Sequence, residues 1–403
     1  MRDFSNHATR PPDRSVEITG IETCVVEGNF AWNYVKVHTD AGVTGIGESY
    51  RGGAVTDIMG LMEEFLVGEN PLDVERLFRR MVQETSGHGG TTGKVVTAAS
   101  GIEIALWDAA GKLLGLPVYQ LLGGKYRDAV RIYCDCHAGE AFETDEHGYH
   151  EPAADDAYDV DAYAERAADV VDMGFTALKF DLDQPFDNAP DPYNGRVSNA
   201  AIERKVETVE AIRAAIGYEV DLAFDVHWDY SLDSAKRLAQ KLEPYDLMWL
   251  EDVVPPENME AQREVARSTA TPLATGENRF RVHEFKDLLY DFGVDVVTPD
   301  PATCGGLAES KAIASRAEEN YIAFSPHNVT SPVGTVACAH LGAAIPNFST
   351  LEYHALDVPW WDDLLARDGD LIQDGSLEVP DEPGLGIELD EDVVAEHARS
   401  GWS

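Results

Sequence analysis

Three carboxylates recur at one fixed interval in the middle of the sequence. Asp225, Glu251 and Glu277 each end a short apolar segment, and both intervals between them are 26 residues. That length accommodates one β-strand, one α-helix and the two loops that connect them. Acidic side chains placed once in each such unit converge at the carboxyl ends of parallel strands. The spacing therefore predicts a parallel barrel with three carboxylates at one mouth.

Apolar segments and amphipathic stretches alternate over a long part of the chain, which is typical of repeated βα units. We expect eight strands, at 130–135, 177–182, 221–226, 247–252, 272–277, 294–299, 322–327 and 349–354. No regular helix of normal length follows the eighth strand. The predicted fold class is therefore α/β, a modified TIM barrel of the (β/α)7β type.

The segment before the barrel has a different character. Its β-rich runs over 16–48, with a turn at Asp40–Gly42, predict an antiparallel meander. A helical region follows and ends at Gly115, a glycine C-cap. We expect an α+β capping domain that the C-terminal tail completes.

The predicted organisation has four parts. They are a flexible tail at 1–15, the capping (lid) domain at 16–128, the catalytic barrel at 129–356, and a tail at 357–403 that packs back on the capping domain.

The charge of the chain is strongly negative. It has 73 acidic and 31 basic residues, a formal net charge of −42, while 44% of residues are hydrophobic, enough for a packed core. Self-repulsion of this size requires screening by ions, so we expect a protein from a high-salt organism. The same charge disfavours nucleic acid and anionic membranes as partners.

Two further features predict a cytoplasmic protein. Five scattered cysteines, an odd number, are typical of buried thiols in a reducing compartment. The sequence has no secretory signal pattern and no uncharged apolar run of about 18 residues.

The strand ends carry the residue types of a metal-assisted reaction. Three converging carboxylates with no basic partner nearby favour a hard divalent cation such as Mg²⁺. Six more polar side chains occupy strand-end positions: Lys179, Asp181, His227, Asp300, His327 and Glu352. A lone histidine or a lone aspartate before proline has a structural explanation, but nine polar groups at equivalent positions predict a site.

These residue types suggest removal of a proton next to a carboxylate. That reaction needs an electrostatic sink for the developing enediolate, which a divalent metal provides. His327 suits the role of base, and Asp300 on the neighbouring strand would fix its tautomer. His227 suits the role of general acid in a β-elimination of water.

Several motifs together resemble one family. They are GFTALKFD, FDVHW, WLEDVVPPEN, ATGEN, TPDPATCGG, SPHNVTSP and LEYH. The chain resembles the enolase superfamily in its mandelate racemase and muconate lactonizing branch, and within it the acid-sugar dehydratases of galactonate and gluconate type. The resemblance covers nearly the whole chain.

The resemblance implies a role for each matching residue. Asp225, Glu251 and Glu277 would bind Mg²⁺, and the Asp300–His327 pair would take the C2 proton. His227 would expel the 3-hydroxyl as water. Lys179 would help to hold the substrate carboxylate, and Glu352 would hydrogen-bond it as the enediolate forms. The resemblance also implies a homo-oligomer.

The second strand departs from the racemases of this branch. They carry Lys-x-Lys there, whereas this chain has Lys179-Phe180-Asp181. Two-base racemisation through Asp181 is therefore disfavoured, although His227 leaves an epimerase open.

Four residues are expected to contact substrate. The resemblance implies two lid loops, here Asn29–Asn33 and Ser49–Gly53, in which Trp32 and Arg51 are candidates for the distal end of the substrate. Asp181 and Asn278 are the other two candidates.

The predicted function is Mg²⁺-dependent dehydration of an aldonic acid, D-gluconate or D-galactonate first, to a 2-keto-3-deoxy sugar acid. Three alternatives stay open. They are a dehydratase of a pentonate such as xylonate or arabinonate, a racemase or epimerase of a 2-hydroxy acid, and a non-catalytic family member.

Overall fold

The computed structural model describes residues 16–50, 52–85, 87, 90–136, 143–144, 150–151, 159–183, 194–291 and 293–403. The tail predicted at 1–15 lies outside this part of the chain.

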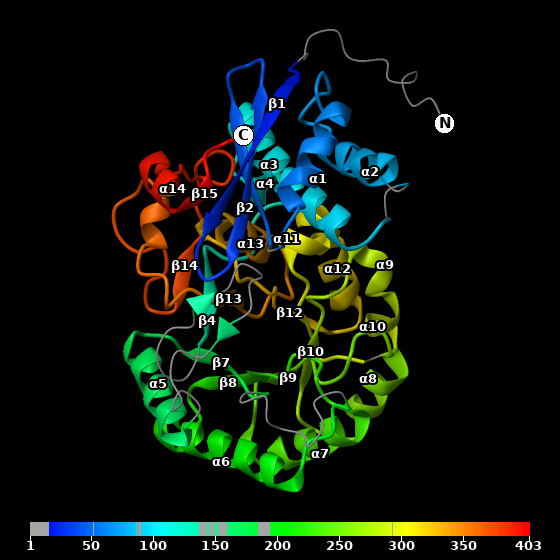
Figure 1. Cartoon of the computed structure of the whole chain (residues 1–403), viewed down its shortest axis with the longest axis vertical. Helices are drawn as coiled ribbons and strands as arrows, with labels where there is room; N and C mark the ends of the chain where they lie inside the picture. The colour runs from blue at the N-terminus through cyan, green and yellow to red at the C-terminus, as the bar shows by residue number, and fades with distance from the viewer. Residues whose placement is uncertain are drawn as a thin grey trace.

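Eight parallel strands form the barrel in the lower part of Figure 1. They are β4 (Ala129–Asp135), β7 (Ala177–Asp181), β8 (Asp221–Asp225), β9 (Trp249–Glu251), β10 (Leu273–Thr275), β11 (Val296–Val297), β12 (Ala323–Phe324) and β13 (Leu351–Tyr353). Consecutive strands pair in parallel, and β13 pairs with β4. A parallel bridge from Phe324 to Phe348 joins β12 to the segment before β13 and closes the ring. The predicted (β/α)7β fold class is confirmed.

Helices surround the barrel and connect its strands (Figure 1). They are α5 (Val160–Asp172), α6 (Asn199–Ile216), α7 (Leu232–Leu242), α8 (Met259–Ala266), α9 (Arg281–Glu284), α10 (Lys286–Tyr290), α11 (Pro301–Cys304), α12 (Gly306–Glu319) and α13 (Pro332–Ala343). In α7, Ala235, Leu238 and Leu242 face the core, while the Ser231 side chain caps the first turn. The apolar stripe of such a helix holds it against the strands.

The capping domain is built on an antiparallel sheet of β1 (Ile18–Glu27), β2 (Ala31–Thr39) and β3 (Thr44–Ser49). Its helices are α1 (Val55–Met62), α2 (Val74–Glu84), α3 (Lys94–Leu114) and α4 (Val118–Leu121), with a 3-10 turn, η1 (Glu63–Phe65). Gly45 and Gly47 let β3 lie directly on α3, because a Cβ on either would come within 2.1 Å of a carbonyl oxygen of that helix. Gly115 ends α3 in the left-handed conformation, as predicted.

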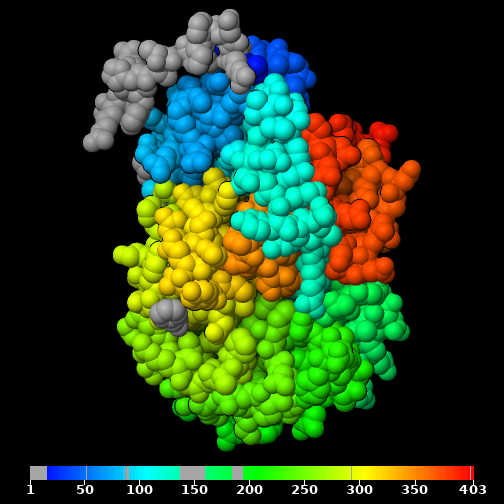
Figure 2. All heavy atoms as spheres, turned by 180° about the vertical axis from the view of Figure 1, so that it is seen from behind, coloured from blue at the N-terminus to red at the C-terminus, as the bar shows by residue number. Residues whose placement is uncertain are grey.

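The C-terminal tail completes the capping sheet. Its strand β15 (Ala398–Ser400) pairs antiparallel with β1. Asp108 on α3 accepts a hydrogen bond of 2.7 Å from the Leu385 backbone N–H, and the tail lies beside α3 and α4 in Figure 2. The remaining elements are β14 (Ser376–Glu378), which pairs with β4, α14 (Glu391–His397), the hairpin β5 (Glu143–Thr144) and β6 (His150–Glu151), and the turns η3 (Glu243–Tyr245) and η4 (Asp362–Leu364).

Two buried carboxylates dock the capping domain onto the barrel. Glu48 at the end of β3 accepts hydrogen bonds from the backbone N–H groups of Ser331 (3.0 Å) and Gly334 (2.9 Å), at the start of α13. Glu103 on α3 accepts from Leu307 (2.8 Å) and Ala308, at the start of α12. Helix N-termini favour such carboxylates because their first N–H groups have no partner within the helix. These contacts hold the capping domain against the barrel.

The five cysteines are buried, as expected, and form no disulfide within the described part of the chain. Within the described parts of the chain, no helix combines the length and apolar character needed to cross a membrane.

Candidate active site

Three carboxylates meet at the carboxyl end of the barrel. Asp225 is the last residue of β8 and Glu251 the last residue of β9, and the strand register places these two positions side by side. Glu277 lies two residues beyond β10. Each residue offers an oxygen within 4.8 Å of the other two, so a single cation could contact all three.

The electrostatics of this group fit a divalent cation. Asp225 and Glu251 are buried. Burial and the neighbouring negative charge of Asp225 raise the pKa of Glu251 to about 7, although Lys179 opposes the shift. The Oε1 atom of Glu251 has no hydrogen-bond partner among the described residues. A hard dication would satisfy that oxygen and offset the repulsion between the carboxylates.

Lys179 on β7 is a buried cation surrounded by acids, so the expectation that the three carboxylates have no basic partner nearby is wrong. Its Nζ lies 2.7 Å from Glu352 Oε1, 3.3 Å from Glu251 Oε2 and 3.4 Å from both Asp225 Oδ2 and Asp135 Oδ2. Burial alone would lower the pKa of Lys179, but the surrounding carboxylates outweigh it and raise the pKa well above its ordinary value. The lysine is therefore charged.

His327 and Asp300 form a buried pair. His327 Nδ1 lies 2.9 Å from Asp300 Oδ2, and the other carboxylate oxygen of Asp300 accepts the Ala302 N–H at the start of α11. The opposite ring nitrogen of His327, Nε2, lies 3.3 Å from Glu277 Oε2. Burial would lower the pKa of His327, but the charges of Glu277, Glu352 and Asp300 raise it to about 10.

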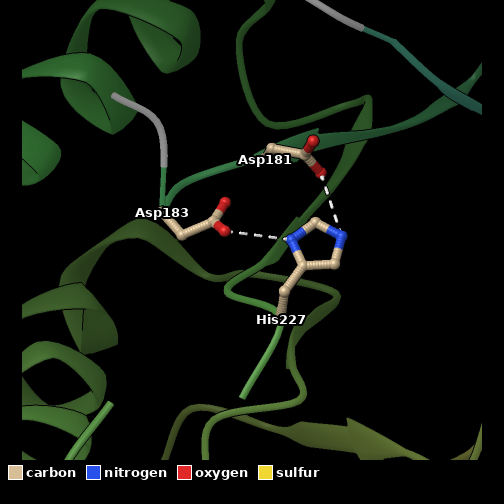
Figure 3. Close-up of side chains that lie close together, drawn as sticks. All are labelled: Asp181, Asp183 and His227. Atoms are coloured by element: carbon tan, nitrogen blue, oxygen red, sulfur yellow. Dashed lines mark hydrogen bonds and ion pairs between the residues drawn. The ribbon is translucent and has the colours of Figure 1, made fainter. Parts of the chain in front are cut away.

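His227 lies on the other side of the metal-ligand candidates. Its Nδ1 is 3.2 Å from Asp183 Oδ2, and its Nε2 is 3.8 Å from Asp181 Oδ1 (Figure 3). Its backbone N–H donates a 2.8 Å hydrogen bond to Asp225 Oδ1. The side chain is 37% exposed, so one edge of the ring is accessible. The site thus has a histidine on each side of the carboxylates.

Two protein-family models match the chain. The model described as "Enolase C-terminal domain-like" matches residues 162–393, more than half of the chain, and the "Mandelate racemase / muconate lactonizing enzyme, N-terminal domain" model matches residues 22–123. The chain belongs to the enolase superfamily.

Relatives within the superfamily match 90% or more of the chain. A D-xylonate dehydratase from Haloferax volcanii is 49% identical over 100% of this chain and 95% of its own length. A D-galactonate dehydratase from Xanthomonas oryzae is 31% identical over 90% of each chain. A mandelate racemase/muconate lactonizing enzyme-like protein from Rubrobacter xylanophilus, of known crystal structure, is 43% identical in sequence. The match covers 96% of this chain and 98% of that one, with a TM-score of 0.91. The predicted acid-sugar dehydratase group and its hydro-lyase class are confirmed.

In this superfamily member, the strand-end side chains predicted from sequence lie at one end of the barrel. They are Lys179, Asp181, Asp225, His227, Glu251, Glu277, Asp300, His327 and Glu352. Asn278 is beside them, with its Nδ2 3.3 Å from Glu277 Oε1.

Of the two substrate-contact candidates in the lid loops, Trp32 and Arg51, the structure describes only Trp32. Trp32 is fully buried, its indole N–H donates to the Val329 carbonyl at 3.1 Å, and its ring meets the Trp360 ring edge-on at 5.8 Å. These contacts explain the buried position of Trp32 by packing alone, so no contact with a substrate is needed to explain it. Arg51 lies outside the described residues.

Several site neighbours were not singled out from the sequence. Tyr50 places its ring 5.4 Å from that of His327, Asn328 donates its N–H to Glu352 Oε2 at 2.7 Å, and Asp135 faces Lys179. Asp135 ends the first barrel strand, so the strand-end rule could have found it. Asp183 lies two residues beyond β7 and contacts His227.

Proposed function

We propose that this chain dehydrates D-xylonate, a five-carbon aldonic acid, to the corresponding 2-keto-3-deoxy acid. The observation that carries the substrate assignment is the full-length 49% identity to a D-xylonate dehydratase, against 31% to the D-galactonate dehydratases. It favours the pentonate alternative over D-gluconate or D-galactonate, the substrates predicted first from the sequence.

Asp225, Glu251 and Glu277 would hold the metal, which we propose is Mg²⁺. Oxygen-only ligands, their burial and the unsatisfied Oε1 of Glu251 support this choice. When bound, the dication stabilises the negative charge that develops on the substrate carboxylate as C2 loses its proton.

His327 would remove the C2 proton. Asp300 accepts a hydrogen bond from Nδ1, which leaves Nε2 as the nitrogen that receives the proton. The second hydrogen bond of Asp300, from Ala302, holds the carboxylate in place. The aromatic ring of Tyr50 packs against the imidazole of His327, with the ring centroids 5.4 Å apart.

Lys179 would bind the substrate carboxylate. It is a charged donor within reach of the candidate metal ligands, and Glu352 holds its Nζ at 2.7 Å. Burial would raise the pKa of Glu352, but Lys179 and His327 lower it far below its ordinary value. Glu352 is therefore ionised and has no proton to donate to the substrate carboxylate, which differs from the role that the resemblance implied. We propose instead that Lys179 donates the hydrogen bond to the substrate carboxylate and that Glu352 positions this lysine.

His227 would supply the proton for the leaving 3-hydroxyl. The electron pair of the broken C2–H bond forms the C2–C3 double bond, the C3–O bond breaks, and the hydroxyl takes the His227 proton and leaves as water. The resulting enol becomes the 2-keto acid by tautomerisation. His227 lies beside Asp225, whereas His327 lies beside Glu277, which supports this division of roles.

A substrate panel tests the proposal. D-xylonate, arabinonate, D-gluconate and D-galactonate are each assayed for 2-keto acid release at high KCl with Mg²⁺. We expect D-xylonate to give the highest kcat/KM. A higher value for a hexonate would overturn the substrate assignment, and inversion at C2 without keto acid would indicate an epimerase instead.

A further inference from the structure

Each histidine of the site has a carboxylate on its Nδ1 atom. Asp300 holds His327 at 2.9 Å, and Asp183 holds His227 at 3.2 Å. Asp183 is 1% exposed, so its position is set by the packing around it. The second pair therefore repeats the arrangement of the first.

The backbone directs the His227 ring into this contact. His227 has a φ of 41° and Trp228 a φ of 56°, a left-handed turn that non-glycine residues adopt only when their surroundings fix it. The His227 N–H bonds Asp225 and the Trp228 N–H bonds the Asp252 carbonyl, which hold the turn. The ring consequently projects toward the end of β7 (Figure 3).

The two carboxylates lie at opposite nitrogens of the ring. Asp183 faces Nδ1, whereas Asp181 faces Nε2 (Figure 3). One ligand atom from each of Asp181, Asp183 and His227 lies within 4.8 Å of the other two, so a cation could also bind this group. Asp183 lies within hydrogen-bond distance of Nδ1, whereas Asp181 Oδ1, at 3.8 Å, is beyond hydrogen-bond distance of Nε2, so the Nε2 proton is available to a substrate oxygen.

We propose that Asp183 is a positioning residue for the elimination step: it accepts the Nδ1–H of His227 and so directs Nε2, with its proton, toward the leaving 3-hydroxyl. This inference rests on the proposed function. Nδ1 keeps its proton throughout, and only the Nε2 proton is transferred, to the C3 oxygen as the C3–O bond breaks. Asp183 touches no reacting atom and acts through His227.

The variant Asp183→Asn tests this role, because an amide of the same size can turn either its oxygen or its N–H toward Nδ1 and no longer fixes the ring. With D-xylonate in D₂O, we expect keto acid formation to fall about 10²-fold. Because C2 proton removal by His327 is intact, recovered D-xylonate should carry deuterium at C2. The variant His227→Asn should show the same slow keto acid formation and the same deuterium at C2. The double variant should form keto acid no more slowly than His227→Asn alone.

A substrate that needs no proton donor separates positioning from a general structural defect. Fluoride leaves without prior protonation, so Asp183→Asn should release it from 3-deoxy-3-fluoro-D-xylonate within about threefold of the wild-type rate. The matched control is Asp221→Asn, at the opposite end of β8, where the carboxylate pairs with Arg131; it should leave both reactions unchanged. If Asp183→Asn does not fold, Asp183→Ser is measured in the same way.

Three results would overturn the role of Asp183. One is equal loss of fluoride release, C2 exchange and keto acid formation in a folded variant. Another is unchanged keto acid formation. The third is a second Mg²⁺ ion per wild-type chain, detected by metal analysis, that Asp183→Asn loses. A wild-type enzyme that converts no D-xylonate would instead refute the proposed function, and the positioning role with it.

Discussion

At the scale of single residues, His327 is under two opposing influences. Burial favours the neutral imidazole, whereas three carboxylates favour the protonated form and raise its pKa to about 10. A base with that pKa would be protonated at neutral pH. The negative charge of Glu277 is the largest single effect that raises this pKa, and a cation bound by its carboxylate would neutralise that charge. The proposed metal site and the proposed base are therefore coupled through Glu277.

Asp300→Asn tests the base at this scale. Asparagine can still cap α11, so we expect the Tm to change by no more than about 2 °C. It removes a charge that stabilises protonated His327, and kcat/KM should fall about 10²- to 10⁴-fold. Loss of that charge lowers the pKa of His327, and the rate rises with pH as the base loses its proton. The rising limb of the pH–rate profile should therefore move to lower pH; a profile that stays in place would contradict the assignment.

The sequence was informative for residues whose position depends only on the βα repeat. Asp225, Glu251 and Glu277 follow successive strands, and the parallel register brings such residues together whatever the rest of the fold does. Trp32 and Asp183 depend instead on how distant segments pack. Trp32 meets Trp360 of the tail, and Asp183 meets a histidine on the neighbouring strand, contacts that have no periodic signal in the sequence.

At the scale of elements, helix α13 links the three parts of the molecule. Its first turn binds Glu48 of the capping sheet. His340 in its last turn accepts the Tyr119 N–H of α4 on Nδ1 at 3.2 Å, and its Nε2–H donates to the Leu385 carbonyl of the tail at 3.0 Å. The contact with Tyr119 requires the neutral ring, because Nδ1 can accept a hydrogen bond only when it carries no proton, and burial lowers the pKa of His340 to about 4.

The stability of the fold should therefore depend on His340 in acid. Between pH 6.5 and 4 the unfolded chain binds a proton at this residue and the folded chain does not, so folding loses stability as the pH falls. We expect a loss of about 2 kcal/mol between pH 7 and 5 from this residue. His340→Gln, compared with wild type by urea unfolding at both pH values in 2 M KCl, should lack that part of the loss. Equal losses in the two proteins would contradict the role of His340.

The eight barrel strands were predictable because each is an apolar run between amphipathic segments, although β11 and β12 are only two residues long in the structure. Strands β14 and β15 were not predicted. Both are three-residue segments that form by pairing with β4 and β1 rather than from a pattern of their own. The prediction that the tail completes the capping domain followed from the absence of a regular helix after the eighth strand, and the pairing of β15 with β1 supplies its physical basis.

At the scale of the whole molecule, the net charge of −42 opposes the compact state. Raising KCl from 0.1 M to 2 M shortens the range of charge repulsion, so we expect the Tm to rise by about 10 °C or more. Sucrose at equal osmolality is the control, since it does not screen charge. A Tm independent of KCl, or an equal effect of sucrose, would refute the prediction that this protein requires high salt.

The central claim is that His327 starts a dehydration of an aldonic acid at this site. Proton NMR of D-xylonate in D₂O, with Mg²⁺ and high KCl, follows the C2 proton and the keto acid in one experiment. For the wild type we predict loss of the C2 signal with formation of a 2-keto-3-deoxy acid, and for a folded His327→Asn neither change. Keto acid formation by His327→Asn at near the wild-type rate would contradict the claim.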